Sequence, residues 1–293
     1  MKYSSSYSHE CRNFKNANFF YSGKRLKTVV RTKYKFSDLL TKLAIFKDVL
    51  LYTKPTTTLL YYLLVNKKET TWNDRIFRTY INSKSIEFII NKNGGLGIIS
   101  VRRFEPVVFK YITSQKGKIM IDIGANIGAY SILSYNNFEE ILAVEPGQEA
   151  LHILQQNIIL NNANNITVIS KAVSDKIGSV KLYRTPELVN YSIKNESGSY
   201  IEVQTISLSQ LLHPFNSVDL VKIDVEGSEL EVIYSGLELI TRVKSLIIEV
   251  RQKYVDKIIL LMEKNGFQCY CLEFRKDLQE SNLLFVNTKN NAQ

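Results

Sequence analysis

The chain has 293 residues, of which 45% are apolar and 23% charged, a composition typical of a globular protein with a sizeable core, and its net charge is +10. Its longest apolar run near the N-terminus, "LLYYLLV" from Leu59, is too short to span a membrane, and residues 1–16 lack the apolar centre of a secretory signal. Three cysteines form no disulfide framework, so we expect a protein of the cytoplasm.

The positive charge is concentrated at the N-terminus. Residues 1–70 hold 14 Lys and Arg against 4 Asp and Glu, whereas the remainder of the chain holds 24 of each. Such a segment attracts nucleic acid, anionic lipid or an acidic glycan carrier, and the alternative of equal weight is a solvated basic arm. From Ser37, a plausible N-cap, apolar residues at near-helical spacing predict a helix that ends before Pro55. This helix would pack on the adjacent domain or lie on a membrane surface.

A hairpin and then a regular strand–helix alternation follow. The alternating segments 86–90 and 97–101, separated by "NKNGG", predict a β-hairpin. Strands are predicted at 118–124, 140–146, 165–173, 218–227, 245–250, 267–274 and 282–287. Helices are predicted from about 128 and at 148–162, 228–240 and 254–266, with a hairpin insertion between 178 and 207. This order predicts an α/β fold with a mostly parallel sheet and helices on both faces, whose ligands bind beyond the carboxyl ends of the strands.

The first of these strand ends, "DIGANIG", has the composition of a ligand-binding loop. Gly124 allows a sharp turn after Asp122, and Gly128 allows a helix and a ligand to approach closely. The spacing G-x-x-x-G differs from the G-x-G-x-x-G dinucleotide fingerprint. On its own, the loop therefore also fits a tight strand–helix connection.

Two further strand ends favour a nucleoside-containing ligand. Glu145 follows Gly124 by 21 residues, a position from which a carboxylate accepts hydrogen bonds from both hydroxyls of a ribose. The segment "SKAVSD", residues 170–175, ends the third strand, where it is placed to contact an adenine edge, although alone it fits a polar loop equally well. The three strand ends together predict a nucleoside site.

The strand "VKIDVEG" carries three ionisable residues on one face. Strand alternation puts Lys222, Asp224 and Glu226 on the face opposite the valines and isoleucine. A central parallel strand is normally apolar on both faces, and burying unpaired charge is costly. These side chains therefore form a structural ion-pair network or line a cleft. Glu249, at the end of the next strand, is either another acid of the same rim or an ordinary surface acid.

In their order, these segments resemble the FkbM family of S-adenosylmethionine-dependent methyltransferases. The resemblance rests on "IDIGANIGAYSI", "AVEP", "KAVSD", "VDLVKIDVEGSELEVIYSG" and "LIIEV", and it runs from about Phe104 to Val286. It implies a Rossmann-like class I methyltransferase domain with a seven-stranded sheet whose last strand is antiparallel. We assign residues 1–75 to a basic, partly helical extension that inherits nothing from the family, residues 76–288 to the methyltransferase domain and residues 289–293 to a polar tail.

The resemblance also implies a cofactor, S-adenosyl-L-methionine, and the residues that bind it. Asp122 and the loop after it would hold the methionine part, Glu145 the ribose, and residues 172 and 173 the adenine, while Asp224 would lie near the methyl group. In chain order the set is Asp122, Gly124, Ala125, Asn126, Gly128, Glu145, Pro146, Ala172, Val173 and Asp224.

The reaction implied is O-methylation of a hydroxyl, often on a sugar, glycan or glycolipid. Such a reaction benefits from a well-positioned acceptor oxygen and from a base that takes its proton. The candidates for the base are Asp224 and Glu226, with Lys222 and Glu249 orienting them or the acceptor. No metal site is expected, because the scattered histidines form no ligand cluster with the cysteines.

Two other functions stay open. A ribose 2′-O-methyltransferase of RNA would use the same fold and would explain the basic arm, but the two lysines of its typical Lys–Asp–Lys–Glu tetrad cannot be placed here, so nucleic acid is the less favoured partner. A non-catalytic module would bind a partner or a membrane through residues 1–70, and the intact cofactor loop argues against it. The location that we expect is the cytoplasm, with peripheral contact to a membrane or polyanion through residues 1–70.

Overall fold

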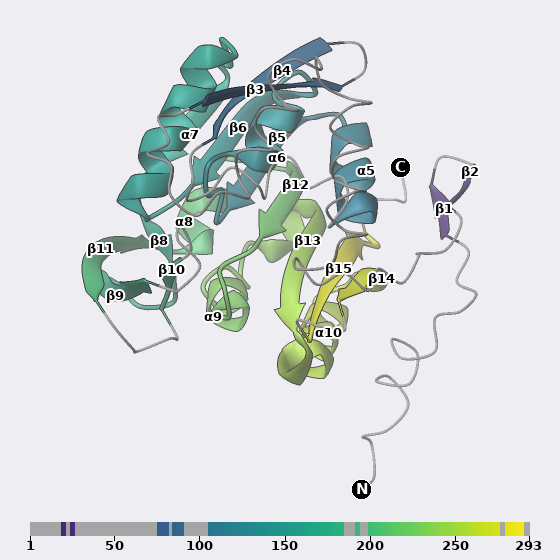
Figure 1. The fold of residues 1–293 in the computed structure, drawn as a ribbon. Coiled ribbons are helices and arrows are strands. Elements are labelled where there is room, and N and C mark those ends of the chain that lie inside the picture. The colour runs from purple at the N-terminus through teal and green to yellow at the C-terminus, as the bar shows by residue number, and fades with distance from the viewer. Residues whose placement is uncertain are drawn as a thin grey trace, which may run out of the picture.

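The domain is built on a seven-stranded sheet. The computed structural model describes residues 19–21, 24–26, 75–81, 84–90, 105–184, 191–193, 199–275 and 279–289. The order of the strands is β14-β15-β13-β12-β5-β6-β7, and all neighbours are parallel except β15, which is antiparallel to both β13 and β14 (Figure 1). The strands are β5 (Gly117–Ile123), β6 (Phe138–Val144), β7 (Ile166–Ile169), β12 (Val218–Ile223), β13 (Val243–Arg251), β14 (Phe267–Arg275) and β15 (Glu280–Asn287). The α/β class, the mostly parallel sheet and its seven strands are thus confirmed.

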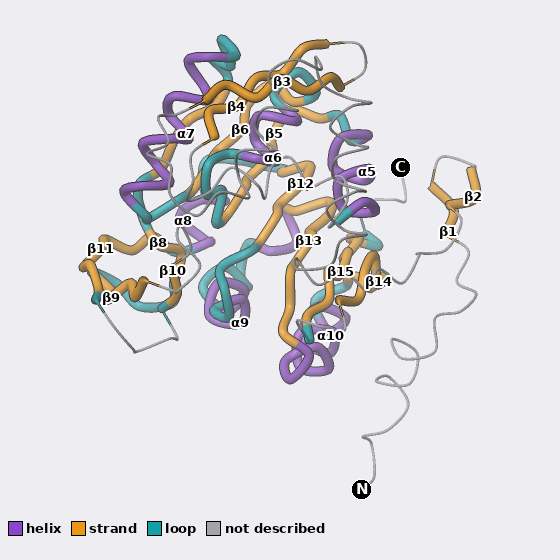
Figure 2. Tube along the Cα trace, viewed as in Figure 1, coloured by secondary structure: helices purple, strands orange, loops and turns teal. Residues whose placement is uncertain are grey.

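Helices cover both faces of the sheet, and neighbouring strand residues divide the core between them. On β5, Met120 belongs to the apolar cluster that contains α5 (Pro106–Ser114), α6 (Ala129–Ser134) and α7 (Gln148–Leu160). Its neighbour Ile121 belongs to the cluster on the other face, with α8 (Leu208–Leu212), α9 (Glu229–Tyr234) and α10 (Val255–Lys264). Figure 2 shows the sheet between these two groups of helices. The short helical turns η1 (Ile240–Arg242) and η2 (Gln252–Tyr254) precede β13 and α10.

A hairpin lies against the first helical layer. It consists of β3 (Arg75–Ile81) and β4 (Lys84–Ile90), and it buries Phe88 fully in the cluster of α5, α6 and α7. The side chain of Asn157 on α7 accepts a hydrogen bond from the backbone N–H of Ile89 at 2.6 Å. The sequence predicted a hairpin in which residues 86–90 pair with residues 97–101. In the structure, residues 86–90 pair with the preceding strand instead, and residues 97–101 lie outside the described residues.

The segment 165–173, predicted as one strand, is divided in the structure. Only β7 belongs to the central sheet, whereas β8 (Ala172–Val173) pairs in parallel with β11 (Tyr200–Ile206). Strand β11 is antiparallel to β9 (Ser179–Arg184), which also pairs with β10 (Tyr191–Ser192), so the predicted hairpin insertion is present. The four strands form a second small sheet, which extends from the end of β7 (Figure 1).

The predicted helices are present, with one shorter than expected. Helix α9 has six residues rather than the thirteen of segment 228–240, because Gly236 packs against Leu208 of α8 and a turn follows. Helix α8 begins at a capping box, in which Ser207 Oγ accepts from Gln210 N at 3.0 Å and Gln210 Oε1 accepts from Ser207 N at 2.9 Å.

The N-terminal expectations fall largely outside the described residues. There the structure describes only the antiparallel pair β1 (Phe19–Tyr21) and β2 (Lys24–Leu26). The predicted helix after Ser37, and all of the polar tail except Lys289, lie outside the described residues. Within the described part of the chain, every helix is too short or too polar to cross a bilayer.

Candidate active site

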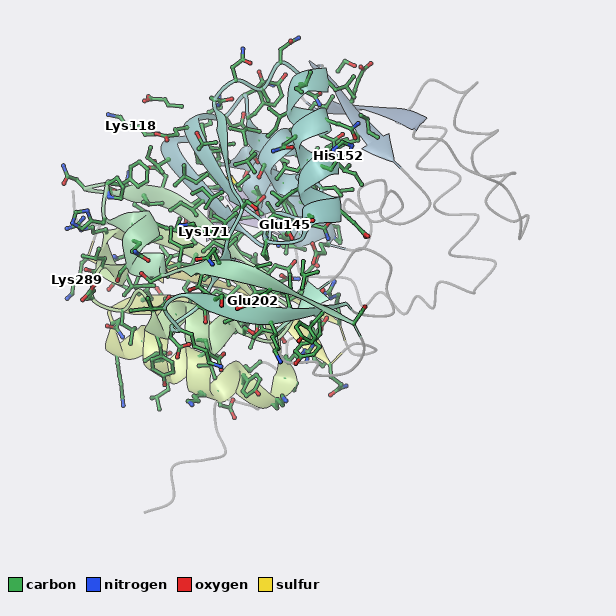
Figure 3. The ribbon with its side chains drawn as sticks, turned by 90° about the vertical axis from the view of Figure 1, so that its left-hand side faces the viewer. Lys118, Glu145, His152, Lys171, Glu202 and Lys289 are labelled. Atoms are coloured by element: carbon green, nitrogen blue, oxygen red, sulfur yellow. The ribbon has the colours of Figure 1, made fainter. Side chains whose placement is uncertain are left out.

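A cleft opens at the carboxyl ends of β5, β6 and β12, at the edge of the sheet where the sequence places its site. It encloses about 690 Å³, including space open to solvent. Figure 3 shows Glu145 and Lys171 at this edge, beside the β9–β11 hairpin that carries Glu202. The residues that line it are Ile123, Gly124, Asn126, Val144, Glu145, Pro146, Lys171, Ala172, Val173, Leu182, Ile193, Asp224, Val225 and Glu226.

The loop after β5 can pass under the cleft only because residue 124 is a glycine. Gly124 has φ +78°, and a Cβ added there would lie 1.8 Å from the carbonyl oxygen of Asp224. The N–H groups of Gly124 and Ala125 both donate to the carbonyl of Val144, at 2.9 and 3.0 Å. Asn126 follows with φ +52°. The loop is thus held against the ends of both β6 and β12, which brings its residues close to Asp224.

Asp122, Ala125 and Gly128 lie behind the cleft and do not line it. The Oδ2 atom of Asp122 accepts from the N–H and the hydroxyl of Ser131, at 3.1 and 2.6 Å, so this buried carboxylate holds the first turn of α6. Burial raises the pKa of Asp122, although the Lys222 ammonium and the bonds from Ser131 lower it. A Cβ at Gly128, where φ is +87°, would collide with Leu154 of α7.

Glu145 ends β6 and directs its carboxylate into the loop. Its Oε2 accepts from Asn126 N at 2.9 Å, and its Oε1 accepts from Gly147 N at 2.7 Å. Each carboxylate oxygen retains a lone pair for a further donor. Burial raises the pKa of Glu145 to about 7, although these two amides lower it. The position therefore fits a group that accepts hydrogen bonds from a pair of ligand hydroxyls.

The far end of the cleft has apolar walls. Ala172 and Val173 form β8, and Leu182 on β9 faces the same space together with Ile193. Residues 172 and 173 thus line the cleft, and their contact with an adenine stays a prediction. Leu182 and Ile193 were missed, and the only signal for Leu182 was the alternation of apolar residues in the predicted hairpin.

Buried Lys222 and partly exposed Asp224 form an ion pair at the end of β12. The Nζ atom of Lys222 lies 2.8 Å from Asp224 Oδ2, and the Lys222 side chain is only 4% exposed. The ammonium also lies 5.0 Å from the centroid of the Tyr130 ring. Burial opposes its charge, but the carboxylates of Asp224, Glu105, Asp122 and Glu249 together raise the pKa of Lys222. Lys222 therefore stays protonated and orients Asp224, which is the residue of the pair that lines the cleft.

Glu226 is separated from this pair. The strand ends at Ile223, and Glu226 adopts φ +55°, which is uncommon for a residue with a side chain. One of its carboxylate oxygens lies 3.9 Å from Arg251 Nη2, in a pair that is about one-third exposed. The sequence predicted one face for all three ionisable residues; Asp224 and Glu226 both line the cleft, whereas Lys222 is buried and does not line it.

Glu249 lies outside the cleft lining, in a second cluster of charges. Its Oε2 atom is 2.5 Å from Arg275 Nη2, and the same guanidinium contacts Glu280 at 2.9 Å and Glu105 at 3.3 Å. Burial and the Asp224 carboxylate hold the pKa of Glu249 well above its usual range, against the effect of Arg275. Sequence reasoning missed Arg275 and Glu105, which reach the site from β14 and from the start of α5.

In the described part of the chain, no three His, Cys, Asp or Glu side chains are arranged to hold a metal ion. The absence of a metal from the site stays a prediction.

The fold and the cleft together define a Rossmann-like α/β domain with a site at the carboxyl edge of its sheet. The sequence signature of the methyltransferase FkbM domain matches residues 122–269, just over half of the chain, and the chain belongs to this family. The match includes the loop after β5, Glu145, the Lys222–Asp224 pair and Glu249, whereas Glu105 and Arg275 lie outside it.

The chain is similar to two curated methyltransferases. It is 26% identical over 151 residues to the methyltransferase sdnD of Sordaria araneosa, an alignment that covers 39% of this chain and 58% of that protein. It is 23% identical over 139 residues to the hexuronic acid methyltransferase AglP of Haloferax volcanii, covering 47% and 57%. The chain thus spans less than three-fifths of the length of either relative.

Among solved structures, the chain is similar to the methyltransferase FkbM from Methylobacillus flagellatus. The identity is 16% and the TM-score 0.42, over 67% of this chain and 55% of that one.

Proposed function

We propose that the protein transfers a methyl group from S-adenosyl-L-methionine to a hydroxyl oxygen of a sugar, glycan or glycolipid. The observation that carries the proposal is the ion pair between buried Lys222 and Asp224, with Asp224 facing a cleft whose other walls suit a nucleoside. Membership of a methyltransferase family supports the reaction class, and the similarity to a hexuronic acid methyltransferase supports a sugar acceptor.

The cleft fits this cofactor in three places. The Glu145 carboxylate is placed to accept the ribose hydroxyls, Ala172 and Val173 to flank the adenine, and the loop at Gly124 and Asn126 to hold the methionine part. When bound, the cofactor supplies a methyl group on a sulfonium, which is open to displacement by an oxygen nucleophile. Asp122, Ala125 and Gly128 would act from behind the cleft, by fixing the loop and the first turn of α6.

Asp224 is the proposed base. When the acceptor oxygen attacks the methyl group, Asp224 would take the hydroxyl proton, and the departing sulfur of the cofactor would keep the electron pair of the broken bond. Its Oδ2 atom is held by Lys222, so Oδ1 is the oxygen that takes the proton. Most of the remaining rate enhancement would come from holding the acceptor oxygen in line with the methyl group.

Labelled S-adenosyl-L-methionine incubated with neutral sugars, uronic acid sugars, glycolipids and RNA tests the reaction and the acceptor class. We expect label in a sugar or glycolipid fraction, and an Asp224→Asn variant slower by about 100-fold or more. Glu226→Gln is the matched comparison, because it removes the other candidate base, and it should lose less than about threefold. Label in RNA alone would favour the ribose 2′-O-methyltransferase instead.

Calorimetry with S-adenosylhomocysteine tests the cofactor site independently of the acceptor. Glu145→Ala should abolish the binding heat, whereas Glu139→Gln, on the exposed opposite end of the same strand, should leave it unchanged. If the wild-type protein gave no heat and no thermal stabilisation, the non-catalytic module would be the better account.

The location and the role of the N-terminal segment are also proposals. The charge of residues 1–70 supports a cytoplasmic protein held at an anionic membrane or polyanion. Sedimentation with vesicles of neutral and anionic lipid, at low and high salt, measures this contact directly.

A further inference from the structure

Lys222 is enclosed by charged and aromatic groups from every neighbouring element. Its ammonium contacts Asp224 at 2.8 Å and faces the ring of Tyr130 on α6. The ionisable groups that face it are Asp122 from β5, Tyr130 from α6, Asp224 from the end of β12, Glu249 from β13 and Glu105 from the start of α5. The side chain is therefore a shared counter-ion for several carboxylates rather than the partner of Asp224 alone.

Glu105 and Tyr130 form a hydrogen-bonded unit, and the Tyr130 ring lies beside Lys222. The hydroxyl of Tyr130 donates to Glu105 Oε2 at 2.6 Å, and both side chains are buried. The other oxygen of Glu105 accepts from Asn282 Nδ2 at 3.2 Å and contacts Arg275 Nη1 at 3.3 Å. Glu105 is thus held by contacts from three elements, α6, β14 and β15.

The charge states of this unit follow from its contacts. Burial opposes ionisation of Glu105, but the Lys222 ammonium, the Arg275 guanidinium and the Tyr130 hydroxyl lower its pKa, so it stays anionic. Burial and the Glu105 carboxylate raise the pKa of Tyr130 well above its usual range, so the phenol stays a donor. Glu105 and Asp224 are therefore two of the carboxylates that share this ammonium.

The position of this ammonium matters for the proposed reaction. The Lys222 ammonium contacts a single oxygen of Asp224, Oδ2, so the position of the ammonium decides where the carboxylate points. Tyr130, beside the ammonium, and Glu105, bonded to Tyr130, keep Lys222 in place. The residue that accepts the acceptor's proton would thus be held in one orientation.

We propose that Glu105 and Tyr130 are positioning residues of the methyl-transfer site, which hold the Lys222 ammonium against Asp224. The proposal rests on the proposed methyl transfer. It adds two residues, one of which, Glu105, lies outside the region that matches the family.

The direct test observes Lys222 and needs no acceptor. In protein labelled with ¹⁵N at lysine Nζ, a buried, hydrogen-bonded ammonium gives a proton–nitrogen signal, and Lys222→Met identifies the signal of Lys222. We expect the signal to persist to the alkaline limit of the folded wild-type protein. In Glu105→Gln it should disappear at a pH lower by about one unit or more, because an anion that favours the charged form is gone. Tyr130→Phe should lower the pH at which the signal disappears by less than half as much.

The second readout is the pH–rate profile of methyl transfer to the sugar that the wild-type protein uses best. Glu105→Gln should lower kcat about tenfold, with the KM of the acceptor changed by less than about twofold. The alkaline limb of its profile should move to lower pH, because the Lys222 ammonium has lost a carboxylate that favours its charged form. Glu280→Gln is the matched control, since Glu280 contacts Arg275 and does not face Lys222.

The outcomes separate the proposal from the proposed function. If Glu105→Gln and Tyr130→Phe behave like Glu280→Gln in both readouts, the positioning role is wrong. If Glu105→Gln fails to fold, Tyr130→Phe decides alone, because it removes one hydroxyl and keeps the ring beside Lys222. If the wild-type protein neither binds S-adenosylhomocysteine nor transfers label, the proposed function fails, and the lysine signal still shows whether Glu105 holds the pair.

Discussion

Strand β12 has an aspartate–lysine pair at each end, and the two pairs have different surroundings. At the amino end, Asp219 Oδ1 lies 2.7 Å from Lys244 Nζ, and the lysine side chain is 53% exposed. At the carboxyl end, Lys222 is buried and Asp224 faces the cleft. The distances are nearly equal, so the surroundings and not the ion pair itself separate a structural contact from a candidate active site.

The amino-end pair is completed by the backbone. Asp219 Oδ2 accepts from the N–H groups of Lys118 and Ile119, at 2.7 and 3.0 Å, which joins the starts of β5 and β12. Burial opposes ionisation of Asp219, but the Lys244 bond and these amides lower its pKa. At the carboxyl edge the effect of burial exceeds that of the hydrogen bonds and cations, so the pKa values of Asp122, Glu145 and Glu249 are raised. Charges that are costly to bury are retained where chemistry can use them.

The largest difference in stability and cofactor binding is expected between alanine substitutions of the glycines at the two ends of β5. Gly124→Ala places a Cβ against the carbonyl oxygen of Asp224 at a positive φ, so the loop must move. We expect it to cost more than about 3 kcal/mol in the free energy of unfolding and to abolish cofactor binding. Gly117→Ala, at the other end, meets only the side chain of Asp219, at 2.5 Å, and should cost about half as much. Urea unfolding and calorimetry of both variants provide the measurement, and equal losses would contradict the contrast.

The two lysines provide the next comparison. Lys222→Met leaves Asp224 without its buried partner, and we expect methyl transfer to fall by about 100-fold or more and stability to fall by about 2–3 kcal/mol. Lys244→Met removes an exposed partner and should cost about 1 kcal/mol or less, with transfer unchanged. If Lys244→Met lost as much activity as Lys222→Met, the carboxyl end would have no special role.

The third comparison is the sign of the pH dependence at each end. The pKa of Glu145 is raised to about 7, so between about pH 4.3 and 7 the folded protein binds more protons there than the unfolded chain. This residue therefore lowers the free energy of unfolding as pH rises, by up to about 4 kcal/mol. The pKa of Asp219 is lowered, so its contribution is present above about pH 3.9 and is lost as pH falls.

Two variants measure separately how Glu145 and Asp219 make the free energy of unfolding depend on pH. Glu145→Gln should flatten the fall in stability between pH 5 and 7, whereas Asp219→Asn should cost more at pH 7 than at pH 3. Urea midpoints measured across this range at constant ionic strength provide the test. Ligand binding should also release protons near pH 6.5, because ribose hydroxyls that donate to Glu145 favour its charged form. A slope that is unchanged in Glu145→Gln would mean that Glu145 is not the titrating group.

Much of the architecture could be predicted from the sequence, because it depends on local periodicity. The apolar strands and the helix α7 lie within a few residues of their predicted positions, and the order of elements limits the topology. The partner of β4 and the departure of β8 from the sheet were not predicted. Both depend on contacts between distant segments, such as the side chain of Asn157 on the backbone of Ile89, which no local pattern encodes.

The candidate site also contains some residues that local patterns predict and others that they do not. Lys222, Asp224 and Glu145 were identified because each lies at a strand end whose face follows from alternation. Glu105 and Arg275 were missed because they reach the site from elements about 120 and 50 residues away from Lys222, and a single acid before a helix has no distinctive pattern. Glu226 lies beyond the end of β12 at Ile223, where strand alternation no longer applies, and it still lines the cleft with Asp224.

The smallest change in the free energy of unfolding is expected from relieving the backbone strain at Glu226, which lies beyond the carboxyl end of β12. A glycine adopts φ +55° without the steric cost of a Cβ, so Glu226→Gly should raise the free energy of unfolding by about 0.5–1 kcal/mol. Loss of the exposed contact with Arg251 should offset little of this gain. Glu226→Gln, which keeps the strain and removes the charge, should not be stabilised, and Gln279→Gly, at φ +54° on the turn before β15, should gain a similar amount. If Glu226→Gly also lost methyl transfer while Gln279→Gly did not, the strained conformation itself would serve the reaction, and the carboxyl end of β12 would differ from the amino end in its backbone as well as in its charges.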